Sequence, residues 1–263
     1  MRFWSWLFRK KKPAKTRVSS PEDRAVLIGI NSYPSAPLHG CVFDIENIGK
    51  FAPAQRITLL NDKATTDAII KALEWLAQTP PNAKAFLWYS GHGVEVTVAD
   101  GIAQAICPVD FDWSSERMIT DRQLVDIFSK MDSTVRFFWG SDSCHSGNLD
   151  TKAFGTRTIQ PPTHIAVAVL NAKARGFRVI RMPAQLNVGF ISGCRHDQTS
   201  TDTEINGQPC GAFTWYFVQA YQKMPLHSTL VRIASSCRDA LVVQGYDQIP
   251  QVDGPRINDP FLE

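Results

Sequence analysis

The sequence has no apolar run approaching the roughly 18 consecutive residues of a membrane-spanning helix, which argues against an integral membrane protein. It also has no Cys-x-x-Cys pair, the usual spacing of zinc ligands. The six cysteines are widely spread and follow no secretory signal, so we expect reduced thiols in a cytoplasmic protein. With 44% hydrophobic and 20% charged residues, the composition excludes a disordered or fibrous chain.

Strong net charge is absent as well, since the formal charge is only +3. Residues 1–24 contain eight Lys and Arg but only two acidic residues, so the remainder carries a net charge of −3. The basic character therefore belongs to the tail, and nucleic acid is not an expected partner of the body. We treat residues 1–23 as a tail and residues 24–263 as one domain.

The tail combines aromatic and basic residues. An aromatic cluster that includes Phe3, Trp4 and Trp6 precedes a basic run. This composition is typical of segments that rest on an anionic membrane surface, so residues 1–17 are a candidate peripheral membrane contact. The alternative is a disordered leader.

The body alternates between two hydrophobic patterns. Continuous apolar runs, typical of buried parallel strands, predict strands at 25–30, 57–60, 85–89, 135–139 and 188–192. Helical spacing of apolar residues predicts helices at 66–78, 120–131, 212–221 and 229–242. Strands alternating with helices predict an α/β fold with a mostly parallel sheet covered on both faces.

Two predicted strands are followed by residues suited to catalysis. In parallel sheets, ligands bind beyond the carboxyl ends of the strands. His92, flanked by two glycines, follows one strand, and Cys144 follows another. Each alone has an ordinary explanation, as a turn residue or a structural cysteine, and with His145 they could also form a metal site. Because Cys144 and His145 are adjacent, one ion would be poorly ligated, so the pair favours nucleophilic catalysis.

The chemistry of such a pair is well defined. A free cysteine is only a few per cent thiolate at pH 7, and a nearby imidazole can take its proton and later protonate a leaving amine. We therefore assign Cys144 as nucleophile and His92 as general acid/base. The backbone N–H groups of Gly93 and Cys144 are expected to stabilise the oxyanion.

At these residues the chain resembles the caspase-like cysteine peptidases, most closely the metacaspases, including bacterial members. The histidine motif is Tyr89–Gly93 and the cysteine motif is Asp142–Gly147. Further matching motifs are Leu38–Cys41 with Asp44, Cys107–Phe111, Ile191–Cys194, Asp197–Ser200 and Gly211–Thr214. The resemblance implies a caspase-like three-layer α/β/α sandwich with a large-subunit-like region (24–150), a connection (151–186) and a small-subunit-like region (187–263).

The resemblance also implies an endopeptidase that cuts protein or peptide substrates after Arg or Lys. The corresponding acidic S1 pocket would be formed by Asp44, Asp142 and Ser90, with Cys41 lining it. Carboxylates in a partly desolvated pocket suit a guanidinium or ammonium group. The alternatives are that Asp44 caps a helix starting near Ile45 and that Asp142 holds the nucleophile loop. We expect Asp142→Ala to abolish cleavage after Arg and to leave the fold intact.

Calcium is a further implication, because many metacaspases bind it through aspartates. Asp121 and Asp150 stand where two ligands would be, but Arg122 stands at a third position. A cation in place of a carboxylate opposes a divalent ion, and Asp121 also suits the first turn of a helix. We therefore expect no cofactor to be required for the chemistry, with calcium a candidate regulator.

Several alternatives stay open at the level of sequence. The basic connection at 151–186 could contain a self-processing site or be a solvated loop. The whole chain could be a catalytically silent caspase-like scaffold that binds a partner, or a thiol hydrolase acting on another ester or amide. The resemblance implies a monomer.

Overall fold

The computed structural model describes residues 20–99, 101–144, 155–175, 186–195 and 198–262. Among these residues no helix has both the length and the apolar character needed to cross a membrane. The tail prediction for residues 1–17 and the ligand prediction for Asp150 fall outside the described residues.

A six-stranded sheet organises the molecule, in the order β11-β8-β7-β3-β1-β2. All its strand pairs are parallel except β11 with β8. The strands are β1 (Arg24–Gly29), β2 (Gln55–Leu60), β3 (Lys84–Ser90), β7 (Arg136–Asp142), β8 (Val188–Ser192) and β11 (Gln251–Asp253). β3 is buried at every position, as a central strand covered on both faces must be.

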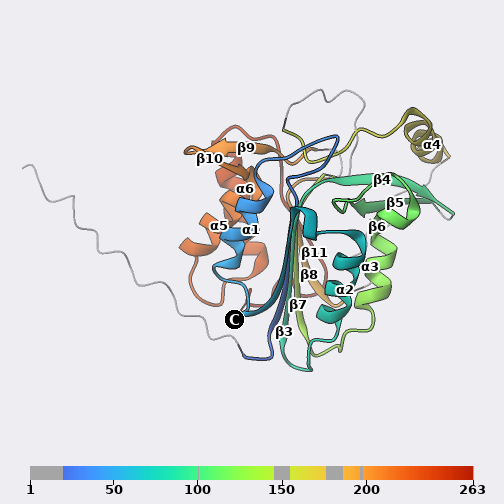
Figure 1. The fold of residues 1–263 in the computed structure, drawn as a ribbon. Coiled ribbons are helices and arrows are strands. Elements are labelled where there is room, and N and C mark those ends of the chain that lie inside the picture. Colours follow the sequence, from blue (N-terminus) through green and yellow to red (C-terminus); the bar gives the residue numbers. More distant parts are fainter. Residues whose placement is uncertain (1–19, 100, 145–154, 176–185, 196–197, 263) are drawn as a thin grey trace, which may run out of the picture.

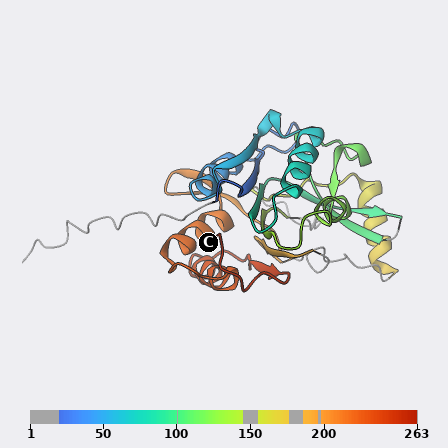
Figure 2. The same cartoon turned by 90° about the horizontal axis from the view of Figure 1, so that it is seen from below.

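Helices cover both faces of the sheet, giving the predicted three layers (Figures 1 and 2). On one face lie α1 (Cys41–Gly49), α5 (Ala212–Lys223) and α6 (Leu230–Val243), and on the other lie α2 (Thr66–Ala77) and α3 (Asp121–Phe128). α3 begins with a capping box between Thr120 and Gln123. Each face has its own buried apolar cluster.

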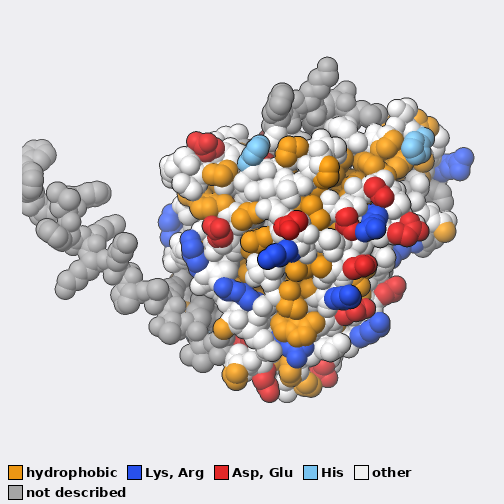
Figure 3. Space-filling model, viewed as in Figure 1, with side chains coloured by type: hydrophobic (Ala, Val, Ile, Leu, Met, Phe, Trp, Pro, Cys, Tyr) orange, Lys and Arg blue, Asp and Glu red, His pale blue; other side chains and the backbone are white. Residues whose placement is uncertain are grey.

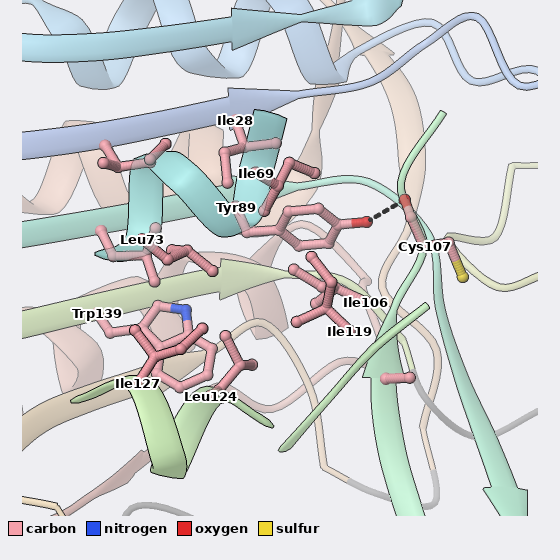
Figure 4. Packing of buried hydrophobic residues seen from close by; sticks show 14 of the residues in the cluster. Ile28, Ile69, Leu73, Tyr89, Ile106, Cys107, Ile119, Leu124, Ile127 and Trp139 are labelled. Atoms are coloured by element: carbon pink, nitrogen blue, oxygen red, sulfur yellow. Dashed lines mark hydrogen bonds between the residues drawn. The ribbon is translucent and has the colours of Figure 1, made fainter. Parts of the chain in front are cut away.

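Figure 4 shows part of the cluster under α2 and α3, where Leu73, Leu124 and Ile127 pack toward Trp139 of the sheet. On the opposite face, Trp88 of β3 stacks on Phe213 of α5 with ring centroids 5.7 Å apart. Alternate residues of β3 belong to the two apolar clusters. This alternation fixes the register of the strand. A register fixed in this way also fixes where the polar residues beyond each strand emerge.

Smaller elements surround the carboxyl end of the sheet. One sheet contains β4 (Gly93–Val98), β5 (Gly101–Ile106) and β6 (Ile119–Thr120), and a hairpin contains β9 (Asp202–Ile205) and β10 (Gln208–Gly211). The short 3-10 turns are η1 (Asn61–Lys63) and η2 (Ser115–Arg117). The described part of the connection includes α4 (Thr163–Ala174), whose Lys173 pairs with Glu95 of β4 at 2.6 Å. The connection is therefore partly helical, which its basic composition did not indicate.

Charges of both signs are interspersed on the face seen in Figure 3, with hydrophobic side chains between them. No single sign dominates that face.

Candidate active site

Strand register brings the two motif loops together. In the parallel pairing of β3 with β7, Ser90 lies opposite Asp142. His92 lies two residues after Ser90, and Cys144 lies two residues after Asp142. The segments that follow β3 and β7 therefore leave the sheet at the same edge. The pairing predicted from the apolar runs therefore places the histidine and cysteine motifs side by side.

Two tyrosines build the turn that holds His92. The Tyr33 hydroxyl accepts a hydrogen bond from the His92 N–H at 3.1 Å, and the Tyr89 hydroxyl donates to the His92 carbonyl at 2.6 Å. The Tyr89 hydroxyl also lies 3.1 Å from the Cys107 carbonyl (Figure 4). A Cβ on Gly91 would approach both hydroxyls to 2.6 Å, so glycine is needed between the strand and the histidine.

The His92 ring is oriented by a backbone carbonyl. Its Nε2 lies 2.7 Å from the Ala36 carbonyl oxygen, which only accepts hydrogen bonds, so Nε2 carries the proton. Nδ1 is buried and has no hydrogen-bond partner among the described residues. Burial lowers the pKa of His92 to about 4, although the nearby backbone carbonyls of Ala36 and Arg157 act in the opposite direction. The neutral ring therefore has one lone pair available as a base.

The Cys144 side chain is buried beside the strand-like segment that contains Ser200. Its Sγ contacts the Ser200 N–H and lies 3.7 Å from the Ser200 carbonyl oxygen. A second sulfur, that of Cys194, lies 3.8 Å away.

A segment of the chain itself crosses this site. The carbonyl oxygen of Arg157 accepts hydrogen bonds from Gly93 N–H and Cys144 N–H, each at 3.2 Å. The Arg157 N–H donates to the Ser200 carbonyl at 3.2 Å. Two convergent N–H groups on one carbonyl are the geometry that stabilises a developing oxyanion.

The Arg157 side chain is fully buried in an acidic pocket. Its Nη2 lies 2.7 Å from Asp44 Oδ2 and 3.0 Å from Asp202 Oδ1, and its Nη1 lies 3.1 Å from Asp142 Oδ2. Nη1 also donates to the Ser90 hydroxyl at 2.7 Å. A Cβ on Gly211 would approach Arg157 Cζ to 2.7 Å, so glycine leaves the guanidinium its space.

Other donors hold the pocket carboxylates in place. Asp44 accepts from the Ser90 hydroxyl at 2.8 Å and from the Gly211 N–H at 2.9 Å. Asp142 accepts from the Ser200 hydroxyl at 2.5 Å and from the Thr214 hydroxyl at 2.6 Å. Both carboxylates are therefore positioned whether or not a cation is present.

Burial in the pocket disfavours the ionised forms of its acidic groups. Burial raises the pKa of Asp44 to about 7, and the Arg157 guanidinium partly opposes this rise. Cys41 is buried at the same place, and burial raises the pKa of its thiol to about 12. A cation in the pocket therefore favours the ionised form of Asp44.

Comparison with known proteins places this arrangement in a family. The model of the caspase domain matches residues 22–262. The chain belongs to the caspase-domain family of cysteine peptidases. It is 30% identical to Metacaspase-1A of Aspergillus oryzae and 31% identical to Metacaspase-1A of Neurospora crassa, over 87% of its length in each case. It spans 67% and 62% of those two proteins, respectively.

A solved structure of a Geobacter sulfurreducens protein has the same fold. Its TM-score is 0.67 at 22% identity, and the match covers 89% of this chain and 94% of that chain. The mostly parallel sheet flanked by helices is therefore a caspase-like α/β fold, as the motif resemblance predicts.

Within this caspase-domain protein, the structure contradicts the alternative in which Asp44 caps a helix that starts near Ile45. α1 begins at Cys41, not near Ile45, and Gly40 is its N-cap. The Asn31 side chain accepts from the Cys41 N–H at 2.8 Å and from the Val42 N–H, and so takes the capping role from outside the helix. Asp44 lies within the first turn, and its carboxylate faces the pocket instead of the helix end.

Sequence reasoning missed three contributors to the site: Ala36, Arg157 and Asp202. Ala36 acts through its carbonyl, which no side-chain pattern reveals. Arg157 was only one of several basic residues in the connection, and Asp202 was one acid beyond a motif. A weak signal was available for Asp202, since it lies two residues after Ser200 and alternate residues of an extended segment share a face.

The calcium prediction gains no complete site. Asp121 accepts from the Arg122 N–H at 2.9 Å and the Gln104 N–H at 3.4 Å, and burial raises its pKa. Among the residues that the structure describes, no group of three or more His, Cys, Asp or Glu side chains is arranged to hold a metal ion. Asp121 behaves there as the first-turn acid of α3, and Asp150 lies outside the described ranges.

Proposed function

We propose that this caspase-domain peptidase is an endopeptidase that cleaves after Arg or Lys through a dyad of Cys144 and His92. One observation carries the proposal. Arg157 lies across the site as a P1 residue would, with its carbonyl oxygen on the N–H groups of Gly93 and Cys144. Its guanidinium lies at the same time in the pocket of Asp44 and Asp142.

The mechanism follows from these positions. His92 Nδ1 takes the Cys144 proton, and the thiolate attacks the P1 carbonyl carbon. The oxyanion is stabilised by the N–H groups of Gly93 and Cys144. His92 then returns the proton to the leaving amine, which leaves a thioester on Cys144. Water, deprotonated by His92, hydrolyses the thioester and regenerates the thiol.

The pocket supports the proposed preference for a cation at P1. Ser90, Asp44 and Asp142 present acceptors to both terminal nitrogens of the bound guanidinium. An acidic P1 side chain would meet carboxylates that are already buried, and like charges in a buried site repel strongly. P1 Asp is therefore disfavoured.

The experiment uses fluorogenic peptides that differ only at P1, as Arg, Lys or Asp. Wild type is compared with Cys144→Ala, each with EGTA and with millimolar calcium. The expected result is Cys144-dependent cleavage after Arg and Lys alone. Cleavage after Asp would contradict the pocket assignment, and no cleavage at all would favour the partner-binding scaffold. The EGTA arm determines whether calcium is needed.

We also propose that the protein is a cytoplasmic monomer and that residues 1–17 contact a membrane surface. The support is the cysteine usage and the aromatic-basic composition of that segment. Vesicle cosedimentation tests the contact. Binding to anionic vesicles that weakens with salt supports it, and equal recovery without vesicles contradicts it.

A further inference from the structure

Asp202 contacts Nη2 of the Arg157 guanidinium, whereas Ser90 contacts Nη1. Asp202 begins β9, and its carboxylate is almost fully buried, with 4% of the side chain exposed. Its Oδ1 lies 3.0 Å from Arg157 Nη2. Nothing in the motif resemblance assigns a role to this residue.

The Asp202 carboxylate is held rigidly. It accepts hydrogen bonds from the His39 N–H at 2.8 Å and from the Gly40 N–H at 3.0 Å, directly before α1. These bonds tie the β9–β10 hairpin to the segment that carries Asp44 into the pocket. A carboxylate fixed by two backbone donors keeps its place when the pocket is empty.

The three carboxylates divide the guanidinium between them. Asp44 and Asp202 share Nη2, whereas Asp142 with Ser90 binds Nη1. Arginine presents a planar fork whose nitrogens lie one bond further from the backbone than the ammonium of lysine. The ammonium nitrogen of a lysine would lie near the position of Cζ. From there it cannot contact the Asp44–Asp202 pair and the Asp142–Ser90 pair together.

We propose that Asp202 is a specificity-determining residue that favours Arg over Lys at P1, a proposal that rests on the endopeptidase function above. Asp202→Asn keeps the size of the side chain and one acceptor oxygen but removes the charge. Because hydrogen bonds to a charged partner are about twice as strong as neutral ones, we expect kcat/KM for a P1 Arg peptide to fall about tenfold or more. The loss for the matched P1 Lys peptide should be about threefold or less.

The matched control is Asp126→Asn, which removes an exposed carboxylate from α3 on the other face of the sheet. It should leave kcat/KM unchanged for both the P1 Arg and the P1 Lys peptide. If Asp202→Asn folds poorly, Asp202→Ala provides a second measurement of the ratio of kcat/KM between the Arg and Lys peptides. An equal loss for Arg and Lys peptides would overturn the proposal and leave Asp202 a structural residue. Failure of wild type to cleave either peptide would instead refute the proposed function.

A separate observation concerns two sulfurs. Cys144 and Cys194 follow the adjacent parallel strands β7 and β8, and their Sγ atoms lie 3.8 Å apart. Both side chains are buried, Cys194 with 7% exposed. A disulfide needs an S–S distance of about 2.05 Å, so a movement of less than about 2 Å would join them.

From this proximity we infer that Cys144 and Cys194 form an oxidation-sensitive pair. Cys144 thiolate attacks hydrogen peroxide, giving a sulfenic acid and hydroxide. The Cys194 thiol then attacks that sulfur and expels its oxygen as water, so two thiols and one peroxide give one disulfide and two waters. The disulfide would block the nucleophile and protect it from irreversible oxidation.

Peptide mapping after peroxide treatment of the full chain tests this pair without needing activity. The expected product is a Cys144–Cys194 linked peptide that dithiothreitol separates. In Cys194→Ser, Cys144 should proceed to the sulfinic acid and resist dithiothreitol. Cys237→Ser, which removes a buried thiol of α6, should behave as wild type. Wild-type Cys144 recovered as sulfinic acid without the linked peptide would overturn the inference.

Discussion

At the scale of single residues, Asp44 combines burial with an ion pair to Arg157. Its carboxylate is inaccessible to solvent, and it faces Arg157 and Ser90. Because burial raises its pKa to about 7, its charge changes near neutral pH. The pocket therefore binds a cation most strongly when this carboxylate has lost its proton.

This gives a pH dependence with a definite sign. The pKa of about 7 already includes the lowering by the Arg157 guanidinium. For a P1 Arg peptide, kcat/KM should therefore rise as the pH increases beyond about 7, since Asp44 in the empty pocket ionises at or above that pH. Asp44→Asn should lower the value and flatten the rise, because its side chain does not titrate. A pH–rate profile of both enzymes checks the prediction. The same rise in Asp44→Asn would assign the titration to another group.

Asp142 supports structure as well as the pocket. It accepts from the Thr214 hydroxyl and N–H and from the Ser200 hydroxyl. These bonds predict that Asp142→Ala is destabilising, contrary to the sequence-based expectation, since buried donors left unsatisfied cost about 1–3 kcal/mol each.

We expect Asp142→Asn, which retains acceptor capacity, to fold more stably than Asp142→Ala and to lose most cleavage after Arg. Thermal unfolding and kcat/KM, measured on both variants, separate the two effects. Undiminished cleavage in Asp142→Asn would remove Asp142 from the pocket.

At the scale of elements, the turn between β3 and β4 fixes the position of His92. Gly91→Ala would push against the hydroxyls of Tyr33 and Tyr89. We expect kcat to fall at least about tenfold, while the Arg-to-Lys preference is kept, because the carboxylates that contact the guanidinium come from other segments. Steady-state kinetics with the Arg and Lys peptides check this, and a changed preference with unchanged kcat would contradict it.

The segment around Arg157 is presented to the nucleophile as a substrate would be. We predict cleavage between Arg157 and Thr158 in the purified chain, seen as a new N-terminus at Thr158 by mass spectrometry. Arg157→Gln should abolish this product, whereas Arg175→Gln, an exposed change at the end of α4, should not. A product at Thr158 that persists in Cys144→Ala would show that another protease makes it.

At the scale of the whole molecule, apolar runs predicted the sheet and its layers well. The runs cannot show where pairing stops. β7 continues to Asp142 because its backbone pairs with β3 through Gly140 and Ser141, whatever the side chains. The start of helix α1 was placed near Ile45 instead of Cys41 because the side chain that accepts from its first N–H groups is Asn31, ten residues before it.

The residues of the candidate site were also predictable only in part. His92 and Cys144 could be predicted because each directly follows a strand, so local pattern and topology suffice. The contact of Arg157 with Asp44 spans 113 residues and that with Asp202 spans 45. No local pattern encodes such pairs, and only the packing of the hairpin and the connection against the sheet edge brings them together.

The central claim is that one centre contains both the nucleophile and an acidic S1 pocket. Covalent labelling with a chloromethyl ketone peptide tests both at once, because the thiolate displaces chloride only when P1 is seated. We predict a single adduct on Cys144 with the P1 Arg probe, much slower labelling with the P1 Asp probe, and loss of this discrimination in Asp142→Asn. Equal labelling by both probes, or an adduct on another cysteine, would contradict the account.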